Sequence, residues 1–577
     1  MKILLASILA LPLIAQGQEP QAATSAVPAE SAPVEGIPVT NPLVISKCGT
    51  CHTRDAKGNM LRISWERSTP EGWEEAIKRM VRLRGVKLTP EEARSILKYL
   101  ATDHGLAPEE AKPIMYYAEH RILDETNIPN DNVKGACANC HALARPLSWR
   151  RSAEDWKYLA NLHIALYPQA DEAFRLGLAA GGFDEERRRP DPNAPKPVDI
   201  ALEYLSKTAP LHTPEWAAWR ARMREPKLTG TWMVSVHIPG HGNFCGEMEI
   251  TPVAGAVDEF NTRVKLTSLT DGTTITRTGH SLVYGGYAWR GRSKGALPAN
   301  AAPNDLNSDV REVMWISPDQ SSGEGRWFWG EYQEFGFDVT MKRSSADPTL
   351  IGVDRTMLKT GSQAARLRLI GESLPAQISP ADLDFGSGVT VKRIVSHTPT
   401  QIVAEVDVAS DAVSGKRDIA FRRSVLPSAI AVYDRIDYIA VIPDSALAHL
   451  GSTVHPKGYQ QFEAVAYQRG ADGKAHTADD VELGSVDVKW SMEEFYSVYD
   501  DDDREFVGSL SSTGLFTPSS DGPNPQRKFS RDNYGDVWVV ATAKDLKDQD
   551  GRPLMGKSYL VVTVPTYIKW DQPEVGQ

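Results

Sequence analysis

The motif Cys48-Gly49-Thr50-Cys51-His52 recurs later in the chain as Cys137-Ala138-Asn139-Cys140-His141. Each copy separates two thiols by two residues and adds a histidine directly after them. This pattern is typical of covalent c-type haem attachment, in which both thiols add to one porphyrin and the histidine ligates the iron. A thioredoxin-like redox pair or half of a zinc site would explain one copy, but not two that both end in histidine. The sequence therefore predicts two covalently bound haems c, attached through Cys48, Cys51, Cys137 and Cys140.

A second repeat follows the two motifs. Trp73 precedes Met80 by seven residues, and Trp156 precedes His163 by the same number. A helix is predicted after each of these segments, at residues 90–101 and 198–207, and the two helices end in similar strings of residues. In small cytochromes the distal iron ligand comes from the segment before the last helix. The alignment therefore selects Met80 and His163 as distal ligands.

We accordingly predict that His52 and Met80 ligate the first iron, and that His141 and His163 ligate the second. An axial methionine gives a haem a higher potential than a second imidazole does. One higher-potential and one lower-potential haem are expected. Three competing distal ligands stay open, namely Met60, Met115 and His120.

The beginning of the chain is typical of a secretory signal peptide. Lys2 is followed by an apolar run over residues 3–15, and cleavage after Gly17 would leave Gln18 as the first mature residue. A retained membrane anchor is the alternative, but the run is short for a membrane span, and no other stretch approaches the roughly 20 apolar residues required. Export agrees with the haem prediction, because cytochromes c mature outside the bacterial cytoplasm. We expect a periplasmic protein that does not span a membrane.

The chain has 577 residues and a net charge of −11, with no continuous block of basic residues. This balance argues against nucleic acid as a partner. Residues 18–40 are rich in Ala, Pro, Ser and Glu and are predicted to be a flexible leader.

Apolar spacing of three and four residues, with a helix start at Thr89-Pro90-Glu91-Glu92, predicts a helical di-haem cytochrome c domain over 41–226. Alternating β-branched and aromatic residues follow. They predict an antiparallel β-barrel at 227–346 and two immunoglobulin-like β domains at 347–427 and 428–577. The expected fold class is therefore multidomain, α followed by all-β.

Four other features were weighed as sites. Cys245 has no cysteine partner left and is expected to be a small buried hydrophobe. His237 and His241 have the spacing of helical zinc ligands, but Pro239 and Gly240 would break a helix there. The loop 472–480 lacks the EF-hand glycine and glutamate and is expected to be a solvated turn rather than a calcium site. The acidic run 500–503 is likewise expected to be a solvated loop.

Taken together, the chain resembles the large, α subunit of quinohaemoprotein amine dehydrogenases. The resemblance covers essentially the mature chain. It is carried by both Cys-x-x-Cys-His motifs in front of three β domains, and by three further segments: Leu228-Thr-Gly-Thr-Trp232, Phe337-Asp-Val-Thr-Met-Lys-Arg343 and Ile-Ala-Val-Tyr-Asp-Arg-Ile-Asp-Tyr-Ile at 430–439.

The resemblance implies a periplasmic heterotrimer with a β-propeller subunit and a small subunit that carries a cysteine tryptophylquinone. In such a complex this chain would pass electrons from the quinone through its haems to a soluble blue-copper protein or cytochrome c, and would contribute no catalytic residue of its own. The quinone cannot form here, because its cross-links need clustered cysteines and only Cys245 is spare. Two alternatives stay open: a di-haem peroxidase, and a relay subunit of another periplasmic dehydrogenase.

Overall fold

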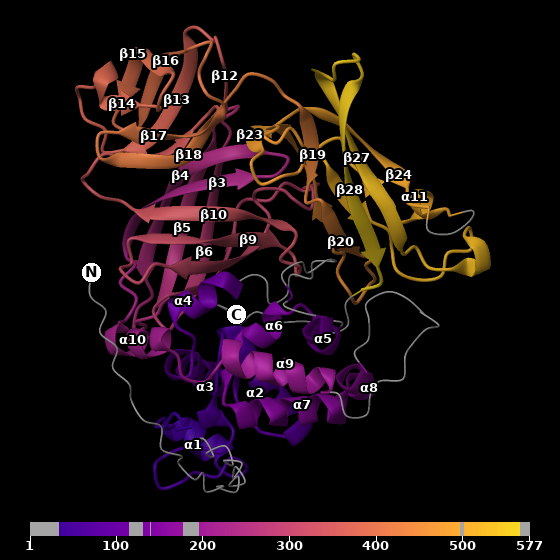
Figure 1. The fold of residues 1–577 in the computed structure, drawn as a ribbon. Coiled ribbons are helices and arrows are strands. Elements are labelled where there is room, and N and C mark those ends of the chain that lie inside the picture. Colours follow the sequence, from indigo (N-terminus) through magenta and orange to yellow (C-terminus); the bar gives the residue numbers. More distant parts are fainter. Residues whose placement is uncertain are drawn as a thin grey trace, which may run out of the picture. The chain divides into compact units, whose positions relative to one another are not determined.

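The computed structural model describes residues 34–114, 128, 131–138, 140–176, 195–496 and 501–565 (Figure 1). The predicted signal peptide and most of the predicted leader lie outside these ranges. The first part of the chain is helical, as predicted. Its elements are α1 (Pro42–Cys48), η1 (Ile63–Trp65), β1 (Glu66–Ser68), α2 (Pro70–Arg84), α3 (Pro90–Asp103), α4 (Pro108–Ala111), η2 (Lys112–Ile114), α5 (Asp131–Val133), η3 (Lys134–Ala138), α6 (Ala144–Leu147), β2 (Trp149–Arg151), α7 (Ala153–Leu166), α8 (Pro168–Leu176), α9 (Pro197–Thr208) and α10 (Pro214–Arg222).

Local capping explains where the main helices begin. The predicted start of α3 is confirmed, because the Thr89 hydroxyl accepts from the Glu92 amide at 3.2 Å and the Glu92 carboxylate accepts from the Thr89 amide at 3.0 Å. The Thr69 hydroxyl caps α2 by accepting from the Gly72 amide, and the helix ends before Gly85, whose φ of 69° is left-handed. The helix predicted at 198–207 is confirmed as α9. Among the helices described, none is both long and apolar enough to cross a bilayer.

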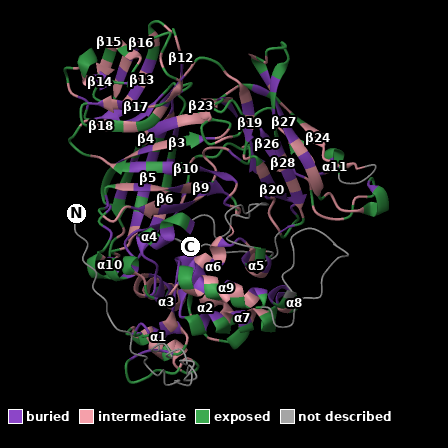
Figure 2. Ribbon diagram, in the orientation of Figure 1, coloured by how far each residue is buried: buried purple, intermediate pink, exposed green. Residues whose placement is uncertain are grey.

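The next part is a closed antiparallel barrel, as predicted. Its strands are β3 (Gly230–Ile238), β4 (Gly242–Pro252), β5 (Glu259–Ser268), β6 (Thr274–Tyr284), β7 (Ala288–Lys294), β8 (Val310–Ile316), β9 (Ser322–Trp329) and β10 (Gly336–Arg343). Consecutive strands pair, and β10 closes the barrel against β3. Buried and exposed residues alternate along β5 (Figure 2). Trp232, Trp289 and Trp327 are fully buried in the barrel core.

Two β domains complete the chain, which confirms the predicted fold class. The first has two four-stranded sheets, β11-β13-β16-β15 and β12-β18-β17-β14. Its strands are β11 (Thr349–Val353), β12 (Met357–Lys359), β13 (Ala365–Glu372), β14 (Leu383–Asp384), β15 (Val389–Thr398), β16 (Gln401–Val408), β17 (Gly415–Phe421) and β18 (Ser424–Tyr433), with η4 (Pro380–Asp382) before β14. Strand β18 runs across the point between residues 427 and 428 where the sequence suggested a boundary.

The last domain has a four-stranded sheet, β20-β28-β27-β24, and two three-stranded sheets, β19-β22-β23 and β21-β26-β25. Its elements are β19 (Tyr438–Ile442), β20 (Ser445–His449), β21 (Gln460–Gln461), β22 (Glu463–Gln468), β23 (Val481–Ser485), β24 (Val488–Glu494), α11 (Asp503–Phe506), β25 (Gly508–Leu510), β26 (Leu515–Pro518), η5 (Lys528–Ser530), β27 (Gly535–Lys547) and β28 (Pro553–Thr563). Strand β20 pairs in parallel with β28, and the other pairs within these sheets are antiparallel.

The barrel anchors the start of α2, which matters for the candidate sites below. Arg290 on β7 pairs with the Glu71 carboxylate, and both side chains are almost fully buried. The second contact between them, from Nη2 of Arg290 to Oε2 of Glu71, measures 3.1 Å. A buried ion pair of this kind holds position well, since separating its partners leaves uncompensated charges. The N-terminal end of α2 is therefore fixed against the barrel.

Candidate haem sites

The first attachment motif lies at the end of α1. Asn41 caps this helix, and the helix ends at Cys48, which is half-buried, while Cys51 is exposed. Burial raises the pKa of the Cys48 thiol, and the nearby Cys51 adds to the effect. The ring of His52 lies with Nδ1 2.7 Å from the Leu61 carbonyl oxygen. When Nδ1–H donates to this carbonyl, Nε2 is left as the nitrogen that can ligate iron, and the ring orientation is fixed.

Met80 and Met60 are the described thioethers that compete for the first iron. Met60 is fully buried and packs in the main hydrophobic core of the helical domain. Met80 lies on α2, is only half-buried, and belongs to none of the hydrophobic clusters formed by the described residues of this domain. Core packing therefore explains Met60 but not Met80. Met115 and His120, the other competing ligands, lie outside the described residues.

The second site brings its two predicted histidines together. His163 is half-buried on α7, and its Nδ1 lies 2.9 Å from the Leu159 carbonyl oxygen one helical turn earlier. Nδ1 of His141 lies 3.0 Å from the Ala142 carbonyl oxygen. The ring centroids of the two histidines are 6.4 Å apart. Two imidazole nitrogens on opposite sides of one metal are about 4 Å apart, which places ring centroids about 6 Å apart. The pair thus fits one iron between the rings.

Burial also favours the neutral form of His163, which is the form that can ligate iron. It lowers the pKa of His163, to which the nearby Arg79, Arg151 and Arg145 contribute, so the imidazole is neutral at physiological pH. Cys137 is half-buried, and burial raises the pKa of its thiol to about 12. The rings of Phe174 and Tyr167 flank His163, with centroids 6.0 and 6.3 Å from it. Aromatic side chains therefore surround the ligand that the alignment selected.

The repeat found in the sequence is also a structural repeat. The indole nitrogen of Trp73 donates to the His104 carbonyl oxygen at 2.9 Å, just after α3. In the second lobe, the indole nitrogen of Trp156 donates to the Ala209 carbonyl oxygen at 3.3 Å, just after α9. Each tryptophan thus fixes its own helix to the end of the closing helix of its lobe. Met80 and His163 occupy equivalent positions, seven residues beyond these tryptophans.

The repeat extends further than the sequence comparison detected. Ser64-Trp65-Glu66-Arg67-Ser68 corresponds to Ser148-Trp149-Arg150-Arg151-Ser152, and these stretches contain β1 and β2, which pair in antiparallel fashion. The register joins Glu66 to Arg151 and Arg67 to Arg150. Arg151 is the repeat equivalent of Arg67, and Arg150 is the repeat equivalent of Glu66. The two strands are therefore related by an internal two-fold arrangement. Both stretches begin with Ser-Trp and end with Arg-Ser, and this shared sequence could have revealed the repeat.

Buried charges surround this two-stranded ribbon. Arg151 is almost fully buried and contacts Glu66 at 2.6 Å as well as Asp155 on α7. Burial and the neighbouring Glu66 raise the pKa of Asp155. Arg67 pairs with Glu110 at 2.7 Å. Burial opposes ionisation of Glu110, but its bonds to Arg67 hold its pKa at about 2. Sequence reasoning missed these pairs, because their partners are separated by up to 85 residues.

His104 is a further feature that sequence reasoning missed. Its side chain is fully buried, and neither ring nitrogen has a hydrogen-bond partner among the described residues. The ring packs edge-on against Trp73, with centroids 6.2 Å apart. Burial lowers the pKa of His104 to about 4, although the Glu66 backbone lies near enough to favour the protonated ring slightly. The residue is therefore neutral at physiological pH.

The other sequence candidates are structural. Cys245 is buried beside Leu269 and Ile351, as predicted. His237 lies on β3, and its ring contacts Asn243 and Glu463, each at 2.7 Å. The loop 472–480 is a turn between β22 and β23, as predicted, and carboxylates of the loop accept hydrogen bonds from its own backbone amides.

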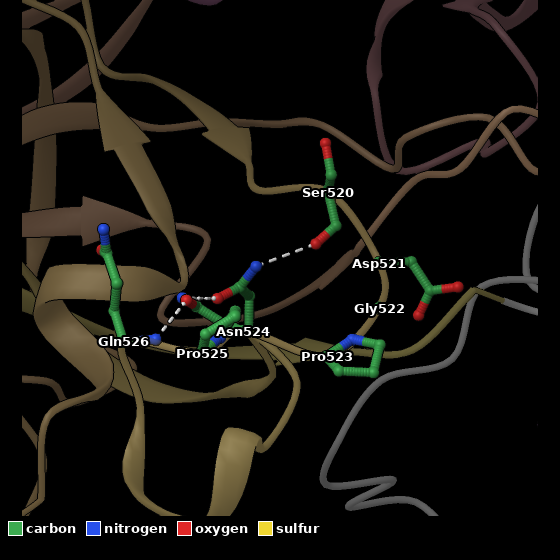
Figure 3. A pocket seen from close by; sticks show the side chains of 8 residues that line it. Ser520, Asp521, Gly522, Pro523, Asn524, Pro525 and Gln526 are labelled. Atoms are coloured by element: carbon green, nitrogen blue, oxygen red, sulfur yellow. Dashed lines mark hydrogen bonds between the residues drawn. The ribbon is translucent and has the colours of Figure 1, made fainter.

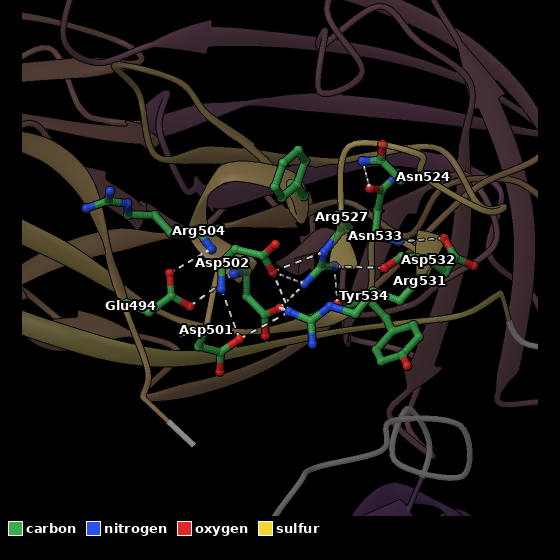
Figure 4. Close-up of polar contacts among 12 residues, drawn as sticks. Glu494, Asp501, Asp502, Arg504, Asn524, Arg527, Arg531, Asp532, Asn533 and Tyr534 are labelled. Carbon is green, nitrogen blue, oxygen red and sulfur yellow. Dashed lines mark hydrogen bonds and ion pairs between the residues drawn. The ribbon is translucent and has the colours of Figure 1, made fainter. Parts of the chain in front are cut away.

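The expectation of a solvated loop at 500–503 is wrong for Asp503, which is 4% exposed. Asp503 and Asp502 pair with Arg527 and Arg531 (Figure 4). Glu494, Asp501 and Asp503 lie close enough together to hold a cation, but these arginines already balance the acidic cluster. A cavity of about 540 Å³ nearby is lined by residues 520–526 and Asn533 and is open to solvent (Figure 3).

A helical region with two haem-attachment motifs, followed by a closed barrel and two further β domains, defines a multidomain haem-binding protein. Family models match nearly the whole chain. A model described as quinohemoprotein amine dehydrogenase A, alpha subunit, haem binding, matches residues 39–176. Models of alpha subunit domains II, III and IV match residues 225–344, 347–434 and 439–575. The chain therefore belongs to the family of quinohemoprotein amine dehydrogenase alpha subunits, which are parts of an oxidoreductase complex.

Three solved structures are similar to part of this chain. The match to a redesigned β barrel shows 17% identity and a TM-score of 0.17. It covers 20% of this chain and 92% of the barrel chain. The match to the redesigned barrel mFAP1, bound to DFHBI, shows 17% identity and a TM-score of 0.17. It covers 20% of this chain and 94% of the mFAP1 chain. The match to human protocadherin-24 EC1-2 shows 15% identity and a TM-score of 0.14. It covers 39% of this chain and 98% of the protocadherin chain. These low scores carry no inference about function. No curated protein matches the sequence.

Proposed function

We propose that this chain is the electron-transfer subunit of a periplasmic amine dehydrogenase. Electrons would pass from a cysteine tryptophylquinone in a small partner subunit through two covalent haems c to a soluble blue-copper protein or cytochrome c. A β-propeller subunit would complete the complex. The observation that carries the proposal is the His141–His163 pair, whose 6.4 Å centroid separation fits one iron. It lies in a two-fold repeat whose other half would supply the second set of ligands.

The haem irons would supply one-electron redox chemistry, and the protein would set their attachment, axial ligation and burial. Cys48, Cys51, Cys137 and Cys140 would hold the porphyrins. The carbonyl oxygens of Leu61 and Leu159 would orient His52 and His163. Met80 would ligate the first iron and give it the higher potential. Downhill transfer would then enter at the bis-histidine haem and leave at the methionine-ligated haem.

The same residues favour a relay over a peroxidase. A peroxidase needs an iron position that peroxide can occupy. His163 faces His141 across the second site, and Met80 is its repeat equivalent in the first lobe. With the proposed ligands, both distal positions would be filled by the protein. Ready binding of cyanide or carbon monoxide together with peroxide turnover would instead support the peroxidase.

We also propose cleavage of a signal peptide after Gly17, and domain boundaries near residues 226 and 346. N-terminal sequencing of the exported chain should begin at Gln18. Limited proteolysis should cut first near these boundaries.

The complex isolated from its native source tests the main proposal. Denaturing electrophoresis should show covalent haem on this chain and covalent quinone on a small partner. The reduced-minus-oxidised spectrum should correspond to two haems per chain, with a methionine-sulfur-to-iron charge-transfer band that Met80→Ala removes. Val81→Ala, one residue further along α2, is the matched control and should keep the band. A chain that purifies without haem, or with a flavin partner, would exclude the proposed function.

A further inference from the structure

The last turn of α2 projects into solvent directly after Met80. Residues 81–85 are all exposed. Val81 is 41% exposed and Leu83 is 55% exposed, although both are aliphatic. Arg82, Arg84 and Lys87 lie among and just beyond them, and all three are exposed. We call Val81, Arg82, Leu83, Arg84 and Lys87 the α2 rim.

The three cations of the α2 rim form no ion pair with any described residue, unlike other cations nearby. Lys78 pairs with Glu74 at 3.2 Å, and Lys47 pairs with Glu92 at 2.7 Å. Residues 78–87 contain no acidic residue, in a chain whose net charge is −11. Cations in a last helical turn do complement the helix dipole. The dipole does not explain why two aliphatic side chains are exposed between them.

We propose that the α2 rim is the docking surface for the soluble electron acceptor, and that this acceptor is a small one-electron redox protein with an acidic surface. The inference rests on the proposed function, because Met80 would ligate the haem from which electrons leave. An aliphatic centre with a charged border suits a transient complex, in which complementary charge steers the encounter more than it adds affinity. Each docking event moves one electron, so that the chain is oxidised by one, the acceptor is reduced by one, and no bond is made or broken.

Charge reversal provides the test. The variant R82E/R84E/K87E inverts the cations of the α2 rim and leaves Met80 in place. The matched control, K342E/K359E/K489E, changes the net charge equally at three exposed lysines on β10, β12 and β24 that form no ion pair with a described residue. The holo chain is reduced with dithionite, desalted and mixed in a stopped-flow instrument with an acidic copper protein. Chemical reduction makes the measurement independent of amine oxidation.

The wild-type second-order rate constant should fall steeply with added salt. The rim variant should lose about tenfold or more at low ionic strength, since steering by complementary charge changes association rates by about 10- to 1,000-fold. The rate constant of the rim variant should also lose most of its dependence on salt. The control should keep both the wild-type rate constant and its salt dependence. A basic cytochrome should show the opposite trend and react faster with the rim variant. Equal losses in the rim variant and the control, or no loss in either, would overturn the proposal.

Two further measurements separate the remaining explanations. The copper protein with zinc substituted for its copper cannot exchange electrons. Calorimetric titration should show that it binds the wild-type chain and does not bind the rim variant. Vesicles of phosphatidylcholine and phosphatidylglycerol in equal parts test a lipid surface instead. Vesicle binding that depends on the rim, with copper-protein binding unaffected, would overturn the proposal. If the wild-type chain carries haem but its rim variants behave normally, the docking surface is wrong and the proposed function stands. If the chain carries no haem, the proposed function fails.

Discussion

His104 should make the helical domain lose stability as the pH falls from 6.5 to 4. The ring is fully buried, and within the part of the chain that the structure describes neither nitrogen has a hydrogen-bond partner. Burial lowers the pKa of His104 from 6.5 to about 4. Below pH 6.5 the unfolded chain takes up a proton at this position that the folded chain does not. The stabilisation that comes from the neutral ring is therefore complete above pH 6.5 and is lost as the pH falls towards 4.

The size of the loss follows from the pKa difference. A shift from 6.5 to about 4 spans about 2.5 units. At about 1.36 kcal/mol per unit, the free energy of unfolding should fall by about 3 kcal/mol over this range, with no further loss from His104 below pH 4. Glu110, whose pKa is held at about 2, contributes its own loss only below its ordinary pKa of 4.5. The two effects therefore occupy largely separate pH windows.

His104→Leu isolates the effect. The variant removes two unpartnered buried nitrogens, so it should be at least as stable as the wild type at pH 4.5 and should lack the extra acid sensitivity. His212→Leu, at an exposed histidine of the same domain, is the control and should keep the wild-type pH dependence. Urea unfolding followed by circular dichroism at 222 nm reports this domain, because nearly all of the described helices lie in it. Parallel stability–pH curves for the wild type and His104→Leu would refute the reasoning.

Three further changes test other features. Arg67→Met should lower the free energy of unfolding in urea titrations by an amount near the lower end of about 3–5 kcal/mol, because the buried Glu110 carboxylate loses its closest cation and keeps only the ion pair with Arg150 at 3.2 Å, and adding Glu110→Gln should restore part of the loss. Thr89→Ala should lower the free energy of unfolding by about 0.5–2 kcal/mol in the same assay, because it removes the N-cap of α3. The control Ser46→Ala, at a serine inside α1 that is not its N-cap, should lower it by less. Met80→His should lower the potential of the first haem towards that of the second in a potentiometric titration, and an unchanged pair of potentials would remove Met80 from the ligand set.

The sequence was informative where the signal is local. The start of α3 follows from Thr89-Pro90-Glu91-Glu92, and the barrel follows from alternating residues and punctuating turns. The position of His163 opposite His141 was also predictable, because the tryptophan alignment makes it the equivalent of another ligand candidate. The assignment of the four iron ligands stays a prediction, and His141 and His163 are the pair whose separation fits one iron.

Long-range features escaped sequence reasoning for physical reasons. Strands β1 and β2 contain three residues each, too few for a periodic pattern. The partners of the buried pair Arg67–Glu110 are 43 residues apart, and no local rule joins them. Asp503 was expected in solvent because it stands in an acidic run, but Arg527 and Arg531 make burial tolerable by supplying opposite charge. In each case the deciding partner is distant in the chain.

The ribbon of β1 and β2 has the register of an isologous contact, in which each surface meets its own copy. In a homodimer of single-haem units, both halves would be chemically identical, and an electron would gain nothing by crossing from one to the other. Fusing the two halves into one polypeptide lets each diverge while the ribbon keeps their spacing. Met80 in one half and His163 in the other are such a divergence. With the ligands proposed above, linking the two unequal halves in one chain would let an electron pass downhill from one half to the other.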